Sequence, residues 1–246
     1  MLKIQRFDTH FRVETGEKNL ALGKKPFKLN AFRQASPKSL FRLVTPSQPM
    51  DNEGIQIIPF YFLADVSGSM SGAPLDALNN LLPMVKESMQ ANPVVADMIR
   101  FGLISFSTDA KVELPLSDLA TFPTASLPKL VARSDTNFGE ALRKLKAEIK
   151  NDFRQLKGDG YKVKRPVALF LSDGAPSDSK ARWQAAFADL TSPDFPQFPN
   201  LVPIGIGKCD REIMRELRHR KDGPAPAPAL FLDDGTNVGA MINELI

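Results

Sequence analysis

Apolar and polar residues alternate in blocks along the chain, and the blocks predict strands and helices in turn. Six short runs predict strands: residues 57–64, 98–106, 110–114, 165–171, 201–206 and 229–232. Helix-opening residues and apolar residues three or four positions apart predict the helices: 74–92, 139 onward, 179–190, 210–220 and 238–246. This alternation predicts a doubly wound, Rossmann-like α/β fold with right-handed crossovers and helices on both faces of the sheet.

The predicted six-stranded sheet is mostly parallel and has one antiparallel edge strand. A tight turn separates the runs 98–106 and 110–114. So short a connection joins antiparallel strands, because parallel neighbours need a longer crossover. We therefore expect a hairpin that adds one antiparallel strand to an otherwise parallel sheet.

The stretch from Ile57 to Gly72 changes abruptly from apolar to polar. After a nearly unbroken apolar run, Asp65, Ser67 and Ser69 stand at alternate positions. One carboxylate and two hydroxyls can converge from such a turn, at the strand end where open α/β sheets place their ligands. Oxygen ligands with few carboxylates favour Mg²⁺. The alternative is a Ser/Gly-rich turn that only caps the next helix.

Two further loops bring oxygen side chains to predicted strand ends. Thr136 lies in a polar loop before the helix that opens at residue 139, and Asp173 follows the strand 165–171. Because the carboxyl ends of parallel strands meet at one edge of a sheet, these residues are candidates for the same site as Asp65.

The motifs DVSGSM, SDTNFGEAL and LFLSDGAPSD resemble the metal-ion-dependent adhesion site (MIDAS) of von Willebrand factor A domains. They are most similar to the form found in bacterial TerY-like proteins of tellurium-resistance and related stress operons. The resemblance covers residues 55–246. It implies that Ser67, Ser69 and Thr136 are hydroxyl ligands of a divalent ion, and that Asp65 and Asp173 bind the ion directly or through water.

One residue departs from the family pattern: Asp135 stands where many members have glycine before the threonine. Its carboxylate either competes with a partner's acid or binds a water close to the ion. Alternatively, it faces solvent and helps the loop to turn.

The resemblance implies a non-enzymatic, Mg²⁺-dependent protein-binding module, with Mn²⁺ or Ca²⁺ as the other candidate ions. Two carboxylates acting through water neutralise a divalent cation poorly, so a carboxylate of a partner protein can complete its coordination. By resemblance, the expected partners are kinase-like or phosphatase-like proteins of the same system, or other stress-response components.

The residues of common hydrolase mechanisms are missing. Of the two histidines, His10 and His219, the second is interpreted as part of a solvated, basic helix C-terminus. Met70 stands where a G-x-S-x-G hydrolase carries its nucleophile. The enzymatic alternative is a metal-dependent phosphotransferase or phosphatase in which Asp65 accepts the phosphoryl group, although Ser67 stands where such enzymes carry a second acid.

Charge separates residues 1–54 from the predicted domain at 55–246. The formal net charge of the chain is +4, but residues 1–50 carry +7 and the rest carries −3. We interpret the basic segment as an arm that packs along the acidic surface of its own domain. The alternative is an arm that docks on a partner or on nucleic acid, although the segment has no recognised nucleic-acid fold signature.

The sequence favours a cytoplasmic protein. No apolar run approaches the roughly 20 residues that span a bilayer, and the first residues lack the uncharged core of a secretory signal. The single cysteine, Cys209, excludes an internal disulfide framework.

Overall fold

A computed structural model of the protein describes residues 11–14, 54–220 and 227–232. In these ranges one eight-stranded sheet has the order β1-β8-β7-β6-β2-β3-β4, and β5 pairs separately with β2. The strands are β1 (Phe11–Glu14), β2 (Gln56–Asp65), β3 (Ile99–Phe106), β4 (Ala110–Ser117), β5 (Lys162–Val163), β6 (Val167–Ser172), β7 (Asn200–Ile206) and β8 (Ala229–Leu232). The helices are α2 (Ala73–Ala91), α3 (Pro93–Met98), α4 (Phe138–Gly158), α5 (Lys180–Leu190) and α6 (Arg211–Glu216), with short 3₁₀ turns η2 (Gly68–Met70) and η3 (Thr124–Ser126).

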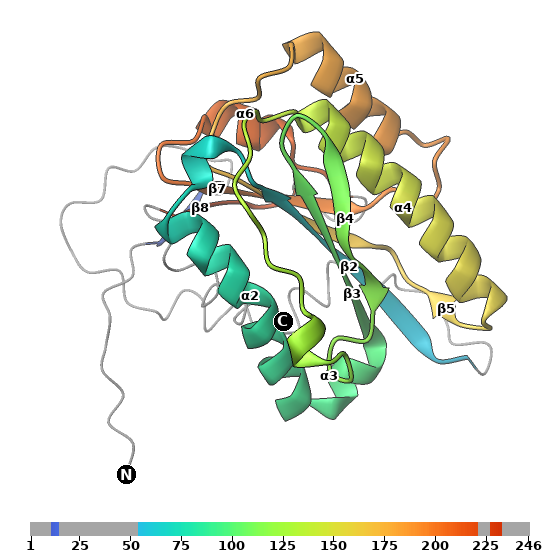
Figure 1. Cartoon of the computed structure of the whole chain (residues 1–246). Helices are drawn as coiled ribbons and strands as arrows, with labels where there is room; N and C mark the ends of the chain where they lie inside the picture. The colour runs from blue at the N-terminus through green and yellow to red at the C-terminus, as the bar shows by residue number, and fades with distance from the viewer. Residues whose placement is uncertain (1–10, 15–53, 221–226, 233–246) are drawn as a thin grey trace.

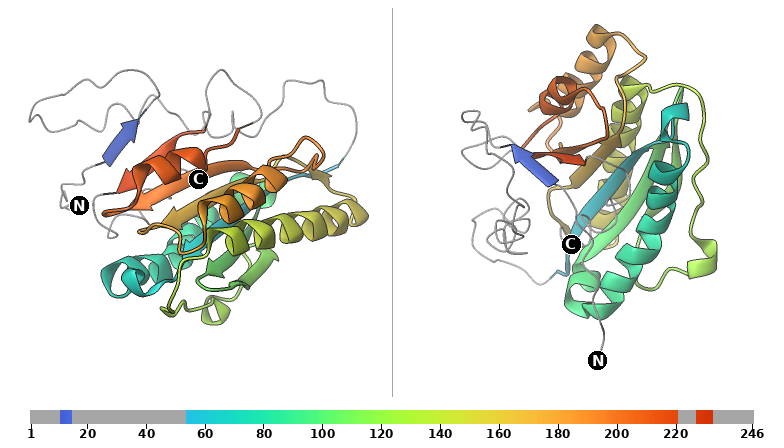
Figure 2. Two further views of the ribbon diagram at one scale, coloured as in Figure 1. Left: turned by 90° about the horizontal axis from the view of Figure 1, so that it is seen from above. Right: turned by 90° about the vertical axis from the view of Figure 1, so that its left-hand side faces the viewer.

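The pairing of the strands confirms the predicted doubly wound, mostly parallel sheet. β2 lies in the middle and pairs in parallel with β3 and β6, and the parallel series continues through β7 to β8. β3 and β4 form the predicted antiparallel hairpin at one edge. β1 and β5 are additional to the six predicted strands, and β1 pairs antiparallel with β8 (Figure 2).

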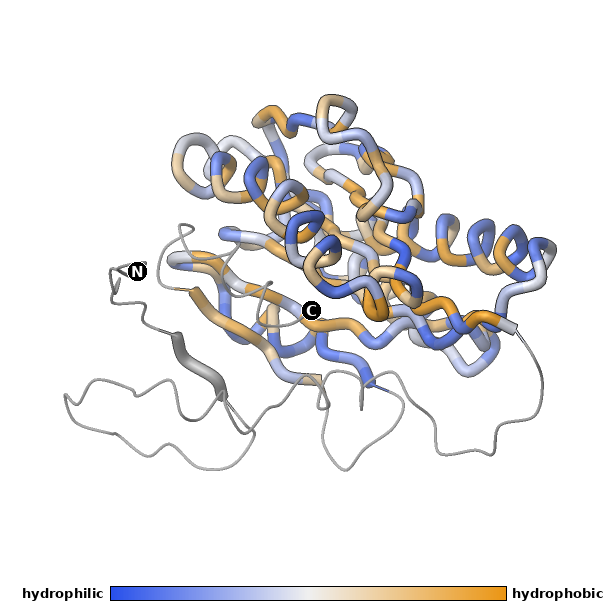
Figure 3. The backbone as a smooth tube through the Cα atoms, turned by 90° about the horizontal axis from the view of Figure 1, so that it is seen from below, coloured by the Kyte–Doolittle hydropathy of each residue, from blue (hydrophilic) through white to orange (hydrophobic). Residues whose placement is uncertain are grey.

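Helices cover both faces of the sheet, with α2 and α3 on one side and α4 and α5 on the other (Figure 1). Successive residues of a strand point to opposite faces. Phe60 and Phe62 of β2 therefore join the hydrophobic cluster under α2, whereas Tyr61 and Leu63 join the cluster under α4 and α5. The apolar colour is concentrated on the strands, while the helices alternate between apolar and polar turns (Figure 3). Because both faces of β2 are buried, its sequence is a nearly continuous apolar run.

The helix boundaries agree with the sequence to within one residue, except that α6 ends at Glu216 instead of the predicted residue 220 and that a separate helix begins at Pro93. α2 ends at Ala91, close to the predicted residue 92, because Pro93 cannot continue it and instead opens the unpredicted α3. The predicted helix 238–246 and most of the predicted arm, residues 1–10 and 15–53, lie outside the described residues. The boundary at residue 54 stays a prediction. None of the helices in the described ranges is long and apolar enough to cross a membrane.

His219 does not belong to a solvated helix C-terminus, so that interpretation is wrong. α6 ends at Glu216, and the backbone of His219 exchanges two hydrogen bonds with Leu201 of β7. The His219 ring lies edge-on to Phe198 and Phe187, at centroid distances of 5.1 and 6.3 Å. Its Nε2 atom is buried and finds no hydrogen-bond partner among the described residues. Burial, together with the charge of Arg165, lowers the pKa of His219.

This burial predicts a pH dependence of stability. Between the lowered pKa of folded His219 and its ordinary value near 6.5, the unfolded chain binds a proton that the folded chain does not. The contribution of His219 to the free energy of unfolding should therefore rise with pH through this window. Asp65, whose pKa burial raises to about 6, contributes with the opposite sign below that pH, so the effect of His219 is read from the difference between wild type and variant. Urea denaturation between about pH 5 and 8 measures the slope.

His219→Gln should remove this contribution from the slope, because the titrating ring is removed. His10→Gln is the matched control, since it removes the other histidine of the chain. An unchanged slope in His219→Gln would show that another group titrates in this range.

Candidate metal centre

The candidate site lies in the middle of the sheet, where β2 and β6 end (Figure 1). These two strands are parallel neighbours, with Ala64 in register with Leu171. The residues that follow, Asp65 and Ser172, are therefore also adjacent. This end of the sheet is the crevice in which open α/β folds bind ligands.

Asp65 is fully buried, and both of its carboxylate oxygens accept hydrogen bonds. Oδ1 accepts from the Ser67 N–H at 2.8 Å, and Oδ2 accepts from the Ser172 hydroxyl at 2.5 Å. Burial raises the pKa of Asp65 to about 6, although the hydrogen bonds from Ser172 and Ser67 act in the opposite direction. A charge that is desolvated in this way favours a cation as its neighbour.

The two serines of the turn connect Asp65 to Asp173. The hydroxyls of Ser67 and Ser69 are 3.2 Å apart, and Ser69 Oγ donates to Asp173 Oδ1 at 2.8 Å. Ser67 is buried, whereas Ser69 is exposed. Four of the five predicted ligands thus form one continuous chain of hydrogen bonds that joins the end of β2 to the end of β6.

The fifth predicted ligand, Thr136, is placed beside this chain by its loop. Thr136 is buried, and its N–H and C=O groups bond to Ser177 in the loop after Asp173. On the other side, the Gly68 N–H donates to the Ser134 carbonyl at 3.3 Å. The structure therefore brings the loops of all five predicted residues together. Ser67, Ser69 and Asp173 are joined through side chains, Asp65 bonds the N–H of Ser67, and Thr136 is held through its backbone.

The donor set is compatible with a hard divalent cation. It consists of two carboxylates and three hydroxyls, all oxygen ligands of the kind that Mg²⁺ prefers. Among the described residues, no group of three or more His, Cys, Asp or Glu side chains could hold a metal ion. A metal at this site would therefore depend on the hydroxyls of the serines and the threonine.

Comparison with known proteins finds one matching family model. Residues 60–175 match the family model of the von Willebrand factor type A domain. This match covers 116 of the 246 residues, a little under half of the chain. A comparison with curated protein sequences found no match.

Two solved structures that resemble this chain are of proximal thread matrix protein 1 (PTMP1) from the mussel byssus. One is 18% identical with a TM-score of 0.56, and it covers 79% of this chain and 49% of the PTMP1 chain. The other, with a zinc-occupied MIDAS motif, is 17% identical with a TM-score of 0.57 and covers 80% and 48%. This chain thus spans about half the length of PTMP1. At these identities the likeness shows the fold alone.

Asp135, the departure from the family pattern, bonds away from the chain of ligands. Its exposed carboxylate accepts a hydrogen bond of 2.9 Å from the hydroxyl of Thr108 in the turn between β3 and β4. The Thr108 hydroxyl also lies 3.3 Å from the hydroxyl of Ser134. These contacts favour the interpretation that Asp135 helps its own loop to turn.

Sequence reasoning missed three residues that organise this site: Ser172, Ser177 and Asp178. Ser172 bonds Asp65, and its hydroxyl also accepts from the Gly174 N–H at 3.3 Å. All three residues belong to the motif LFLSDGAPSD, which was the available signal. Apart from Gly174, their partners lie 39 to 107 positions away along the chain, so a local pattern does not show what they bond.

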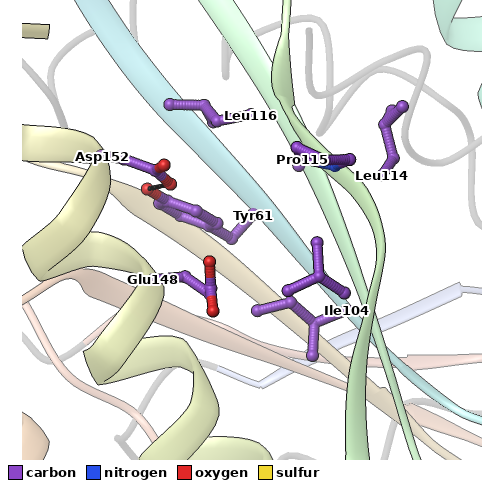
Figure 4. A pocket seen from close by; sticks show the side chains of 9 residues that line it. Tyr61, Ile104, Leu114, Pro115, Leu116, Glu148 and Asp152 are labelled. Atoms are coloured by element: carbon purple, nitrogen blue, oxygen red, sulfur yellow. Dashed lines mark hydrogen bonds between the residues drawn. The ribbon is translucent and has the colours of Figure 1, made fainter. Parts of the chain in front are cut away.

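A small cavity near α4 is a weaker candidate site (Figure 4). Its volume is about 10 Å³, and it lies between Tyr61, β3, β4 and the α4 residues Glu148 and Asp152. The Tyr61 hydroxyl donates to Asp152 Oδ2 at 2.7 Å, and burial raises the pKa of both groups above their ordinary values. This volume suffices for about one water molecule. The cavity is therefore too small for a substrate.

Proposed function

We propose that the protein binds protein partners through a divalent cation held by Asp65, Ser67, Ser69, Thr136 and Asp173. The observation that carries the proposal is the chain of hydrogen bonds from Asp65 through Ser67 and Ser69 to Asp173. Mg²⁺ is the proposed ion, with Mn²⁺ and Ca²⁺ as alternatives. The zinc-occupied MIDAS motif of PTMP1, which has the same fold, supports a divalent metal at this position.

The charge of the site supports docking rather than catalysis. Two carboxylates face the proposed ion, and Asp65 is fully buried with both oxygens engaged, which is a poor arrangement for a nucleophile. Ser69 is exposed, so the site is accessible from solvent on the side where a partner's carboxylate would complete the coordination. The cation would then join the two proteins without a chemical step.

The finer assignment rests on the motif resemblance alone. We propose a cytoplasmic, TerY-like adaptor of a stress-response or tellurium-resistance system, with kinase-like or phosphatase-like proteins as partners. The enzymatic alternative predicts Mg²⁺-dependent hydrolysis of an aryl phosphate that is lost in Asp65→Asn. An assay with such a substrate separates the two proposals.

The exposed serine of the site offers the cleanest test of docking. Ser69→Ala removes one proposed ligand without opening the core, so the fold should persist while partner capture in Mg²⁺ falls at least about tenfold. The measurement is affinity purification of the full chain in Mg²⁺ and in EDTA, with the captured proteins quantified by mass spectrometry.

The matched control is Ser71→Ala, which removes an exposed hydroxyl from the same turn but outside the proposed ligand set. It should capture partners as the wild type does. Equal capture in Mg²⁺ and in EDTA would contradict the proposed function.

A further inference from the structure

We propose that Ser177 and Asp178 are positioning residues of this site: they hold the Thr136 loop against the Asp173 loop and thereby set the affinity for the cation. The inference rests on the proposed function and assigns two residues that do not belong to the proposed ligand set. We call the contacts of Ser177 and Asp178 with residues 136–139 the loop clamp.

The first half of the loop clamp is a reciprocal pair of bonds between Thr136 and Ser177. The Thr136 N–H donates to Ser177 Oγ at 3.2 Å, and the Ser177 N–H donates to the Thr136 carbonyl at 2.7 Å. Both polar backbone groups of Thr136 are thus bonded to one residue. Because the backbone sets the direction of the Cα–Cβ bond, Ser177 restricts where the Thr136 hydroxyl can lie.

The second half is a carboxylate that accepts from the start of α4. The N–H groups of Phe138 and Gly139 donate to Asp178 Oδ1 and Oδ2, at 3.1 and 3.0 Å. The first N–H groups of a helix have no partner within it, and the helix dipole favours a negative charge there. Asn137 already caps α4 by accepting from the Glu140 N–H at 3.0 Å. Asp178 therefore adds a connection to a separate loop.

Gly139 leaves room for the carboxylate of Asp178. A Cβ atom on Gly139 would lie 2.8 Å from Asp178 Oδ2, closer than side chains normally approach. A larger residue would displace the carboxylate of Asp178. Position 139 therefore accommodates the loop clamp because it is glycine.

The loop clamp acts on the site because Ser177 and Asp178 lie in the same loop as Asp173. Only residues 174–176 separate Asp173 from Ser177. The four hydrogen bonds of the clamp thus join the loops that carry Thr136 and Asp173. The bond from Ser69 to Asp173 joins the same loop to the turn after β2. Three loops that hold one another in place present their oxygens with little rearrangement when the cation binds.

The test measures Mg²⁺ affinity by titration calorimetry on the full chain, comparing wild type with Ser177→Ala and Asp178→Asn. We expect each variant to bind Mg²⁺ about tenfold more weakly, as is usual when residues that orient metal ligands are changed. Gly139→Ala should weaken binding through the displaced Asp178. Amide hydrogen exchange of the metal-free protein should be faster at residues 136–139 in all three variants.

Two controls separate positioning from general stability. Ser179→Ala removes a hydroxyl two residues from Ser177 that makes no capping bond to α5. Asp118→Asn alters a carboxylate that accepts from a backbone N–H far from the site, at Ala120. Both should bind Mg²⁺ as the wild type does, whatever their unfolding free energy.

Each outcome decides the inference. Faster exchange at residues 136–139 with undiminished Mg²⁺ affinity would show that the loop clamp only supports the fold, and would overturn the inference while leaving the proposed function intact. A wild-type chain that binds none of Mg²⁺, Mn²⁺ and Ca²⁺ would overturn both.

Discussion

Asp65→Asn is expected to abolish the stabilisation of the protein by Mg²⁺ while leaving the metal-free domain folded. The substitution keeps the shape of the side chain but removes a charge that no water reaches. The cation would lose its most buried carboxylate. The amide keeps one acceptor oxygen, so the metal-free fold would lose only one of the two hydrogen bonds from Ser67 and Ser172. It would also be relieved of a desolvated charge, so the two effects oppose each other.

The measurement is the melting temperature in Mg²⁺ and in EDTA. At an Mg²⁺ concentration about 100 times the dissociation constant, binding stabilises the wild type by about 2.7 kcal/mol. For a chain of this length that corresponds to about 5–10 °C. Asp65→Asn should show no shift.

Asp135→Asn is the matched control for this experiment. It makes the same chemical change in an exposed carboxylate that bonds Thr108. The Mg²⁺ shift should therefore persist in this variant. A full shift in Asp65→Asn would contradict the ligand assignment, and a lost shift in Asp135→Asn would restore the interpretation in which Asp135 acts beside the ion.

The sequence predicted the central strands well because their burial is symmetrical. β2 and β6 lie between parallel neighbours with helices on both faces, so nearly every position must be apolar and the pattern is visible without knowledge of the partners. β5, with two residues, and β1, with four, are too short to show a period. Their pairing depends on long-range contacts that a local pattern does not encode.

The five proposed ligands could be nominated from the sequence because their spacing is local, in motifs at strand ends, and their role as ligands stays a prediction. The residues that support the proposed ligands, Ser172, Ser177 and Asp178, were not predicted, because each bonds a distant segment of the chain. Ser172 reaches Asp65 only because β6 pairs with β2 rather than with β3, and this choice is a property of the sheet order. His219 was misread for a related reason, since its half-buried ring packs against Phe187 and Phe198 from elsewhere in the chain.

Phe138→Ala is expected to be among the most destabilising single substitutions in the described domain. Phe138 has no exposed surface, and its ring lies edge-on to Phe170 and Phe106, at centroid distances of 4.7 and 5.9 Å. These rings come from α4, β6 and β3, directly beneath the loops of the site. Truncation leaves a cavity that close-packed neighbours fill only in part, so the free energy of unfolding should fall by about 3–5 kcal/mol.

Urea denaturation followed by circular dichroism measures this loss, with Phe122→Ala as the control because Phe122 is only partly buried against the other cluster. The control should lose less than half as much.

Since Phe138 follows Asn137 and donates its N–H to Asp178, a void behind the Phe138 ring should also loosen the Thr136 loop and weaken Mg²⁺ binding. A loss below about 1 kcal/mol would mean that the domain collapses around the void. In that case the rings of Phe138, Phe106 and Phe170 could not be what holds the loops of the site in place.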